Sequence, residues 1–277
     1  MKNEVWMVTG ASSGIGLELI KYLLRKGRCV AATTRNKESL IKNIGIAESK
    51  NLISLEVDLS LEESVRDGVL EVIKYYENID VLVNNAGYEQ IGYVEELSIE
   101  EFKHNLEINL FAPIRLIKNI LPYMRKRNSG YIMNITSISG NCYSWPGSCS
   151  YNISKVGLDS LSKTLYSELN SFGIFSTSVI LGQFNTNFFE HQKLPARTNP
   201  IYDLYRKEKI PKNEKEKHCQ RGDVKKLVEV LFEMSELDVP PANIYAGEDA
   251  YTLAFNKAIS ILKNLERWEA LSRHLDI

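Results

Sequence analysis

The sequence predicts an α/β protein with a doubly wound, mainly parallel sheet of seven strands and helices on both faces. Short apolar runs alternate with longer amphipathic segments along nearly the whole chain. The first pair shows the pattern, because Val5–Thr9 forms a buried-strand run and residues 14–26 place their apolar side chains on one helical face before Gly27. Parallel strands need crossover helices, so this alternation favours a sheet covered on both sides.

The later elements follow the same alternation. Two pairs with capping-box spacing, Ser60 with Glu63 and Ser98 with Glu101, predict helices that run to Tyr76 and to about Arg127. Further helices are predicted over 151–171 and as an amphipathic tail from about Asp249. The remaining strands are predicted at 29–34, 52–57, 79–84, 131–136, 174–181 and, weakly, 244–246.

Composition narrows the classes of partner. The 277 residues carry a net charge of -1, so we expect neither a nucleic-acid nor an anionic-membrane partner. Because no apolar run reaches the length of a membrane span, no leader pattern is present and the four cysteines form no C-x-x-C pair, the expectation is a cytoplasmic protein. The four histidines are scattered, and no metal site is expected.

The chain shows no linker and no internal repeat, so we expect one domain over residues 1–277. The exception is an insertion at about 187–222, which carries aromatics, three prolines and a charged run at 212–217. A long excursion of this kind inside a compact domain is usually functional, which makes it a candidate lid over a substrate.

A glycine-rich octet lies between the first strand and the first helix: Thr9-Gly10-Ala11-Ser12-Ser13-Gly14-Ile15-Gly16. Glycine removes the Cβ that would block close approach of a pyrophosphate, and the helix N-terminus offers it free N–H groups and partial positive charge. The spacing differs from the general G-x-G-x-x-G dinucleotide fingerprint. The octet nevertheless predicts a phosphate-binding turn.

The octet resembles the cofactor signature of the short-chain dehydrogenase/reductase family, in its NADP(H)-preferring branch. The likeness extends to about residue 186 and includes these residues in family order: Asp58, Asn84-Asn85-Ala86-Gly87, Asn109, Ser137, Tyr151-x3-Lys155 and Gly182…Thr186. It implies a Rossmann-type fold and a nicotinamide cofactor. The cofactor-binding residues that it implies are Gly10, Ser12, Ser13, Gly14, Ile15, Gly16, Asp58, Leu59, Asn85, Ala86, Gly87, Tyr151, Lys155, Gly182, Phe184 and Thr186. Leu181 departs from the pattern, since relatives usually have proline there.

The end of the second strand bears on the choice of cofactor. It reads Thr33-Thr34-Arg35-Asn36, without the carboxylate that would hold a ribose 2′-OH and repel a 2′-phosphate. Arg35 can pair with that phosphate and Thr34 can add a hydroxyl. Ser13, where some NADP-dependent relatives have a basic residue, adds no support. We therefore favour NADP(H), with NAD(H) as the alternative.

The reacting groups lie in the second half of the chain. Tyr151 and Lys155 are four residues apart, which puts them on one helical face, where an ammonium lowers the pKa of a phenol. The resemblance implies that Ser137 holds the substrate oxygen and that the backbone of Asn109 holds a water linked to Lys155. Together the four residues form the expected catalytic set.

Ser139, Tyr143, Trp145 and Phe188 are the candidate substrate-pocket residues. The aromatic rings of Tyr143, Trp145 and Phe188 suit a medium-sized hydrophobic small molecule. The leading hypothesis is NADPH-dependent reduction of a ketone or aldehyde. The alternatives are an alcohol dehydrogenase that works in the oxidative direction and, more remotely, a non-catalytic dinucleotide sensor. Many members of the family associate through the long helices that carry Asn109 and Tyr151, so a homo-oligomer, dimer or tetramer, is a further expectation.

Overall fold

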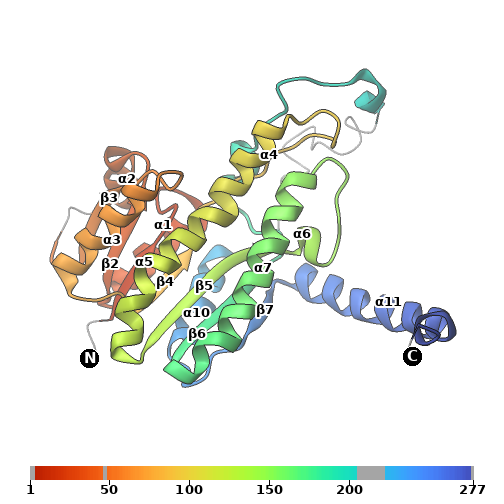
Figure 1. Cartoon of the computed structure of the whole chain (residues 1–277). Coiled ribbons are helices and arrows are strands. Elements are labelled where there is room, and N and C mark those ends of the chain that lie inside the picture. Colours follow the sequence, from red (N-terminus) through yellow and green to blue (C-terminus); the bar gives the residue numbers. More distant parts are fainter. Residues whose placement is uncertain (1–3, 46–48, 205–221, 276–277) are drawn as a thin grey trace.

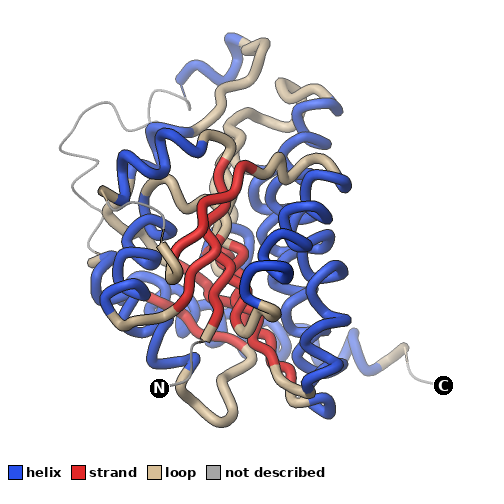
Figure 2. The backbone as a smooth tube through the Cα atoms, turned by 90° about the vertical axis from the view of Figure 1, so that its left-hand side faces the viewer, coloured by secondary structure: helices blue, strands red, loops and turns tan. Residues whose placement is uncertain are grey.

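One parallel sheet organises the molecule. The computed structural model describes residues 4–45, 49–204 and 222–275. The seven strands all run parallel in the order β3-β2-β1-β4-β5-β6-β7, with helices on both sides (Figures 1 and 2). The strands are β1 (Val5–Val8), β2 (Cys29–Thr34), β3 (Leu52–Glu56), β4 (Val81–Asn84), β5 (Gly130–Ser137), β6 (Ile174–Leu181) and β7 (Asn243–Ala246). The predicted fold class is confirmed.

The core consists of two apolar layers, one on each face of the sheet. Along β1, Trp6 and Val8 point into one layer, whereas Val5 and Met7 point into the other. Successive side chains of a strand face opposite ways, so a strand buried on both faces needs an unbroken apolar run. Helices α1 (Gly14–Arg25), α2 (Lys37–Ile44) and α10 (Val224–Ser235) cover the first face. Helices α3 (Glu62–Tyr76), α5 (Ala112–Arg127) and α7 (Cys149–Leu169) cover the second.

Most of the other helical segments follow the carboxyl ends of the strands: α4 (Ile99–Leu106), the π-helical turn η1 (Glu107–Phe111), α6 (Ile138–Asn141), η3 (Asn187–His191), η4 (Pro200–Tyr202) and α11 (Glu248–Arg273). The short turn η2 (Asn170–Phe172) lies at the opposite end of the sheet, between α7 and the start of β6. The expected insertion over 187–222 is described as far as residue 204 and contains η3 and η4. Its charged run at 212–217 lies outside the described residues.

One of the two capping boxes is confirmed and the other is wrong. Ser98 accepts a hydrogen bond from the backbone of Glu101, whose carboxylate accepts one from the backbone of Ser98. At the second site the helix instead begins after Leu61, because the Ser60 hydroxyl donates to Asp58 at 2.6 Å. A carboxylate two residues earlier in the chain out-competes the helix end for this hydroxyl.

Two features were not anticipated. Helices α2 and α10 complete the cover of one face, and the long helix predicted to end near Arg127 is divided by the π-turn η1.

Beyond its first turns, helix α11 extends away from the body of the protein (Figure 1). Among the described helices, none is both long and apolar enough to cross a membrane.

The strand order places the functional edge of the sheet. Chain order reverses between β1 and β4, and ligands of open α/β sheets bind beyond the carboxyl ends of the strands at this switch point. The loop after β1 contains the glycine octet, and the loop after β4 contains Asn85-Ala86-Gly87. The loops after β5 and β6 adjoin them, so four predicted motifs meet at one edge.

Candidate active site at the carboxyl edge of the sheet

The glycine turn packs so closely against its neighbours that a larger residue would collide with them. Gly10 has a φ of 64°, and a Cβ there would lie 2.9 Å from the Cα of Ala86. A Cβ on Gly16 would lie 2.5 Å from the carbonyl oxygen of Gly10. Ser13 precedes α1 without capping it through its side chain. The turn and the helix N-terminus therefore form an open cradle of backbone N–H groups suited to an anion.

Asn85 fastens the β4 loop to this turn. Its side-chain amide donates to the carbonyl of Thr9 at 2.8 Å, and the backbone N–H of Ala86 donates to the Thr9 hydroxyl at 3.0 Å. The amide of Asn85 thus holds the two loops together. Gly87 follows, and a Cβ there would lie 3.0 Å from Asn109 Oδ1 and 3.4 Å from Lys155 Nζ.

A cavity of about 530 Å³ extends from the glycine turn to the ends of β2 and β3. Its wall contains most of the cofactor residues expected at this end of the site, namely Gly10, Ser12, Ser13, Gly14, Ile15, Thr34, Arg35, Asp58, Leu59, Asn85, Ala86 and Gly87, whereas Gly16 does not line it. Hydrogen bonds from Ser60 hold the pKa of Asp58 below its usual range, and the nearby Arg35 guanidinium lowers it further. Asp58 is therefore an anionic acceptor beside a cation. Sequence reasoning missed His104, His191 and Lys193, which line the same cavity.

A second cavity of about 490 Å³ adjoins the first and is lined by three residues of the expected catalytic set, Ser137, Tyr151 and Lys155, whereas Asn109 lines neither cavity. Ser137, Ser139, Tyr151, Lys155, Gly182, Phe184, Thr186, Trp145 and Phe188 line it. Five residues line both cavities: Ile15, Asn85, Gly87, Thr186 and Phe188. Tyr143 lines neither and lies half-exposed, with its ring 4.5 Å from that of Trp145. The combined space suits an elongated ligand whose two ends sit in different chambers.

Tyr151 and Lys155 are buried side by side on α7. The Lys155 ammonium lies 5.8 Å from the centre of the Tyr151 ring and donates to the carbonyl of Ile135 at 2.8 Å. Burial lowers the pKa of Lys155 to about 8. Burial also raises the pKa of Tyr151, as does the nearby Glu89 carboxylate, whereas a hydrogen bond with Ser137 lowers it. The phenol is therefore held in its protonated form at neutral pH.

The two serines after β5 differ in their contacts. The Ser137 hydroxyl contacts the Tyr151 phenol and accepts from the backbone N–H of Ser139 at 3.1 Å. The Ser139 hydroxyl donates to the Asn152 side chain at 2.6 Å. Ser137 is therefore the serine that shares a hydrogen bond with the buried phenol.

Asn109 lies inside the π-turn η1, where the N–H of Ala112 donates to the carbonyl of Glu107. Its amide donates to the carbonyl of Tyr88 at 2.9 Å and to the hydroxyl of Ser154, the neighbour of Lys155, at 3.0 Å. Pro113, four residues later, has no N–H, so the backbone carbonyl of Asn109 lacks its ordinary helical donor. π-turns are frequent at functional sites, and the proline four residues after Asn109 is a signal the sequence already contained.

The loop after β6 closes the site from the other side. Phe184 is buried, and Thr186 accepts from the backbone N–H of Phe188 at 3.3 Å. The Asp249 carboxylate at the start of α11 accepts from the backbone N–H of Gln183 at 2.7 Å. An acidic side chain on α11 therefore anchors the loop at Gln183, two residues after Leu181, which replaces the proline usual in relatives.

Glu89 is the main residue of the second cavity that sequence reasoning missed. It is almost fully buried, and its carboxylate accepts from the Ser148 hydroxyl at 2.8 Å and from the Gln192 amide at 2.6 Å. The segments around Glu89 and Lys193 also pair through their backbones. Glu89 follows the Asn85-Ala86-Gly87 motif by two residues, at the strand edge where ligands bind, and that position was the available signal. Within the described residues, no cluster of histidine, cysteine and carboxylate side chains could hold a metal ion.

Comparison with known proteins agrees with this geometry. Residues 4–195 match the family model described as short chain dehydrogenase. The chain is 30% identical over 268 residues to an uncharacterized oxidoreductase of Schizosaccharomyces pombe, covering 96% of this chain and 89% of that protein. It is 31% identical over 263 residues to the 3-ketodihydrosphingosine reductase of Bacteroides thetaiotaomicron, and the match covers 87% of this chain and 94% of that protein.

Solved structures show the same relation. A short-chain dehydrogenase from Streptomyces avermitilis superposes with a TM-score of 0.88 at 32% identity and 99% coverage of both chains. A variant of actinorhodin polyketide ketoreductase with NADPH superposes with a TM-score of 0.74 at 25% identity, covering 87% of this chain and 94% of that one. A 4-hydroxyisoleucine dehydrogenase complexed with NADH superposes with a TM-score of 0.60 at 31% identity, covering 66% of this chain and 77% of that one. The chain belongs to the short-chain dehydrogenase/reductase family and is an NAD(P)-dependent oxidoreductase.

Proposed function

We propose that the protein reduces a ketone or aldehyde carbonyl on a medium-sized hydrophobic substrate and uses NADPH. One observation carries the proposal: Ser137, Tyr151 and Lys155 line one end of a cavity that is continuous, through shared residues, with the cavity around the glycine turn. This arrangement places a proton donor next to the place where a dinucleotide would end. It also disfavours the sensor alternative, because the complete set of reacting side chains is assembled.

The residues present fit a dinucleotide. A Cβ at Gly10 or Gly16 would collide with neighbouring protein atoms, so glycine allows the close packing of the turn, and Gly10, Ser12, Ser13 and Gly14 line the cavity that a pyrophosphate would enter. Asp58 and Arg35 would hold the adenosine end, whereas Lys155, Phe184 and Thr186 would hold the nicotinamide end. A bound nicotinamide dinucleotide supplies the hydride.

The chain's own residues would donate the proton and orient the substrate and the cofactor ribose. Tyr151 donates its proton to the carbonyl oxygen as negative charge develops there, and Ser137 donates a hydrogen bond to the same oxygen. Lys155 stabilises the phenolate that remains and orients the ribose beside it. Because burial and Glu89 raise the pKa of Tyr151, the phenol is protonated at neutral pH, as a proton donor must be. A phenol in this form can serve as the proton donor that carbonyl reduction requires.

The second cavity suits an apolar substrate. Trp145, Phe188 and Phe189 line it, as do Ile91 and Leu181. Its volume of about 490 Å³ lies in the range typical of small-molecule sites. Two relatives named above are, by name, reductases of ketones on larger substrates, which supports a carbonyl as the reacting group. Tyr143 is proposed to act on the pocket through its contact with Trp145.

The test is a panel of aliphatic, aromatic and long-chain ketones and aldehydes, with the matching alcohols for the reverse reaction. Nicotinamide absorbance is followed with NADPH, NADH and their oxidised forms. We expect carbonyl reduction with NADPH to give the highest kcat/KM. Turnover of alcohols alone would favour the dehydrogenase alternative, and dinucleotide binding without turnover of any compound would favour the sensor.

Arg35 is expected to set the preference for the phosphorylated cofactor. Replacing Arg35 by Glu removes a charge-assisted contact with the 2′-phosphate and adds repulsion. A hydrogen bond to a charged group is worth about 1.5–3 kcal/mol, so the KM for NADPH should rise by about 10- to 100-fold. The KM for NADH should fall or stay unchanged. Initial rates with both cofactors measure the ratio.

The matched control is Arg66→Glu, which makes the same charge change on the exposed face of α3, away from both cavities. It should leave the ratio of NADPH to NADH efficiency unchanged. Equal losses with both cofactors in Arg35→Glu would show that Arg35 does not read the 2′-phosphate.

Glu89 is expected to set the pH range in which Tyr151 works. Its carboxylate raises the pKa of Tyr151, so Glu89→Gln, which keeps the shape and removes the charge, should lower that pKa. In alcohol oxidation the phenolate is the base, and the rise of kcat/KM with pH should therefore move to lower pH. The pH profile of kcat/KM measures this.

Glu100→Gln, an exposed change on α4, is the control and should leave the profile in place. A fall in kcat/KM at every pH, with the profile unmoved, would assign Glu89 only to anchoring Gln192 and Ser148.

A further inference from the structure

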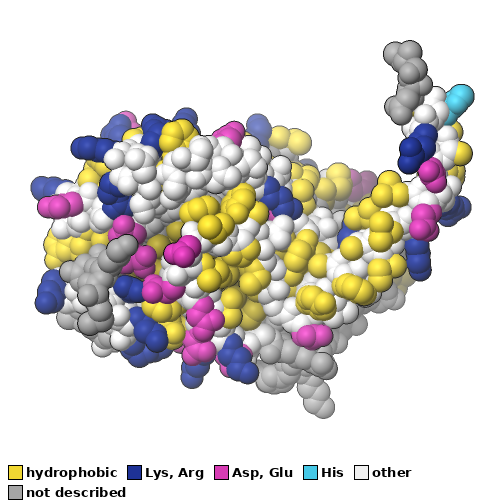
Figure 3. Space-filling view, turned by 90° about the horizontal axis from the view of Figure 1, so that it is seen from below, with side chains coloured by type: hydrophobic (Ala, Val, Ile, Leu, Met, Phe, Trp, Pro, Cys, Tyr) yellow, Lys and Arg dark blue, Asp and Glu magenta, His cyan; other side chains and the backbone are white. Residues whose placement is uncertain are grey.

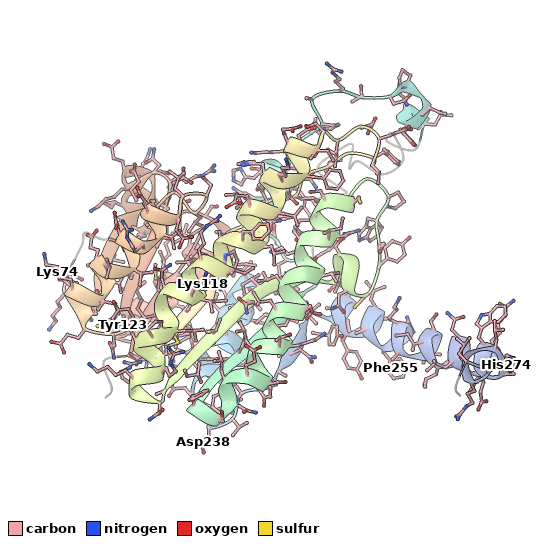
Figure 4. The ribbon with its side chains drawn as sticks, viewed as in Figure 1. Lys74, Lys118, Tyr123, Asp238, Phe255 and His274 are labelled. Carbon is pink, nitrogen blue, oxygen red and sulfur yellow. The ribbon has the colours of Figure 1, made fainter. Side chains whose placement is uncertain are left out.

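The charged side chains of this protein lie mostly at its surface, where the two signs are mixed. Lys74, Lys118 and Asp238 are exposed, as Figure 4 shows, and carboxylates are interspersed with cations on the face seen in Figure 3. The net charge of the whole chain is -1. Neither the net charge nor this face favours a small ligand of one sign, so a preference must come from charges inside the cavities.

Few charged side chains are buried, and one of them is a carboxylate of the second cavity. Among the described residues the buried charged side chains are Glu89, Glu96, Lys155 and Asp159. Lys155 is already assigned to the proton chemistry. Asp159 pairs with Lys163 at 2.7 Å, and Glu96 accepts from backbone N–H groups and lines neither cavity. Of the described carboxylates, Glu89 alone lines the second cavity.

The Glu89 carboxylate is held in place and keeps acceptor positions in reserve. Each of its oxygens accepts one hydrogen bond, from the Ser148 hydroxyl at 2.8 Å and from the Gln192 amide at 2.6 Å. The backbone N–H of Lys193 donates to the backbone carbonyl of Glu89 at 2.9 Å, which fixes the segment. A carboxylate can accept about four hydrogen bonds, so about two positions remain for a ligand in the cavity.

No cation of the described residues balances the charge of Glu89, which is only 9% exposed. Ser148 and Gln192 are neutral donors, and no described lysine or arginine forms an ion pair with the carboxylate. A buried anion is costly unless a cation is paired with it. Glu89 also raises the pKa of Tyr151, so its charge acts close to the reacting phenol. A cationic group on the ligand would balance that charge.

Aromatic rings surround the rest of the same cavity. Trp145, Phe188 and Phe189 line it together with Glu89. The faces of aromatic rings attract alkylammonium groups, and aromatic cages bind methylated ammonium ions in this way. A carboxylate among aromatic rings therefore suits a ligand that joins an apolar body to an ammonium group, and it repels a ligand that carries a carboxylate or a phosphate.

We propose that the substrate is an amino ketone, whose carbonyl lies at Ser137 and Tyr151 and whose ammonium group donates a hydrogen bond to the Glu89 carboxylate. The inference rests on the proposed carbonyl reduction and names the substrate class for it. The reaction itself is unchanged, because the cofactor supplies the hydride, Tyr151 supplies the proton and the ammonium group keeps its own proton. Glu89 then determines substrate specificity by direct binding.

The first test compares phenyl ketones that differ in one group. The β-carbon of each carries a dimethylammonium, isopropyl, hydroxyl or carboxylate group, and the first two groups have nearly the same shape. A hydrogen bond to a charged group changes binding on the order of 10- to 100-fold. With NADPH, kcat/KM should be higher by this factor for the dimethylammonium ketone than for the isopropyl ketone, and it should be lowest for the carboxylate.

Glu89→Gln separates the charge of this side chain from its shape. The preference for the dimethylammonium ketone over the isopropyl ketone should disappear in the variant. Both ketones use the same Tyr151, so any change in the proton chemistry cancels in their ratio. The matched control, Glu190→Gln, removes the same charge from an exposed residue of η3 that lines neither cavity, and it should keep the native preference.

Three results would overturn the amino ketone assignment and leave carbonyl reduction standing. The first is reduction of the isopropyl ketone as efficiently as the dimethylammonium ketone. The second is an equal preference for the hydroxyl ketone, which would show that Glu89 binds a neutral donor. The third is a preference for the dimethylammonium ketone that survives in Glu89→Gln.

A second measurement needs no turnover. Calorimetry with NADP⁺ present compares dimethyl(phenylpropyl)ammonium, which lacks the carbonyl, with its isopropyl analogue. The ammonium compound should bind more tightly on the order of 10- to 100-fold, and Glu89→Gln should abolish the difference. If this difference is found while no ketone is reduced, the cation site stands and carbonyl reduction fails. Equal binding of the two compounds by the native chain overturns the cation site.

Discussion

Replacing Tyr151 by Phe should lower kcat/KM for carbonyl reduction by a factor of about 10² to 10⁴, the usual contribution of a positioned general acid. The change removes one hydroxyl from a buried ring on α7 and leaves the ring to pack as before. The fall should appear in kcat, because the proton is transferred in the transition state and not in the binding of either ligand. Stopped-flow measurement of nicotinamide absorbance gives the rate, and dinucleotide binding by fluorescence should be little changed.

Tyr166→Phe is the control for this experiment. It removes the same hydroxyl from the same helix, where the ring packs on Phe175 and lines neither cavity. Its kcat should remain at the native value. Full turnover by Tyr151→Phe with a good substrate would show that another group donates the proton.

Lys155 should make the stability of the cofactor-free protein rise with pH. Its pKa is about 8 in the folded chain against 10.5 for an unperturbed lysine, because burial disfavours the charged form. Between these values the unfolded chain binds more protons than the folded one, so the free energy of unfolding increases with pH. At 1.36 kcal/mol per pH unit, the gain across this window is about 3 kcal/mol. The gain is complete above pH 10.5 and is lost as the pH falls through about 8.

Urea denaturation at a series of pH values, in the native chain and in Lys155→Met, isolates this contribution, because every other titrating group is common to both. The difference in unfolding free energy should change by about 3 kcal/mol between pH 8 and 10.5. Lys163→Met, which removes an exposed lysine from the same helix, should show the same pH dependence of the unfolding free energy as the native chain. A pH-independent difference for Lys155→Met would show that the buried ammonium keeps its ordinary pKa.

The fold could be predicted because each buried strand is an unbroken apolar run and each crossover helix repeats its apolar residues on one face. Local competition was harder to foresee. Ser60 has the spacing of a capping residue, but Asp58, two positions earlier, takes its hydroxyl. The π-turn around Asn109 depends on how α4 and α5 pack on α7, although Pro113 marks the place where regular helix bonding must fail.

The site could be predicted where residues act through the backbone or through fixed spacing. The glycine turn, Ser137, Tyr151 and Lys155 are brought together as expected. Glu89 could not be placed in the same way, because its partners Ser148 and Gln192 come from segments 59 and 103 residues away in sequence. Tertiary packing decides which loops come into contact, and no local sequence pattern reports such long-range contacts.

The Asp249 carboxylate links the loop after β6 to the start of α11. One carboxylate oxygen accepts from the backbone of Gln183 at 2.7 Å, and the other accepts from the backbone of Ala250 at 2.9 Å, where α11 begins. The loop that contains Phe184 and Thr186, which line the second cavity, therefore shares one anchor with the first turn of α11. A ligand whose binding moved this loop and broke the hydrogen bond between Gln183 and Asp249 would bind with an affinity that depends on how firmly the first turn of α11 holds Asp249.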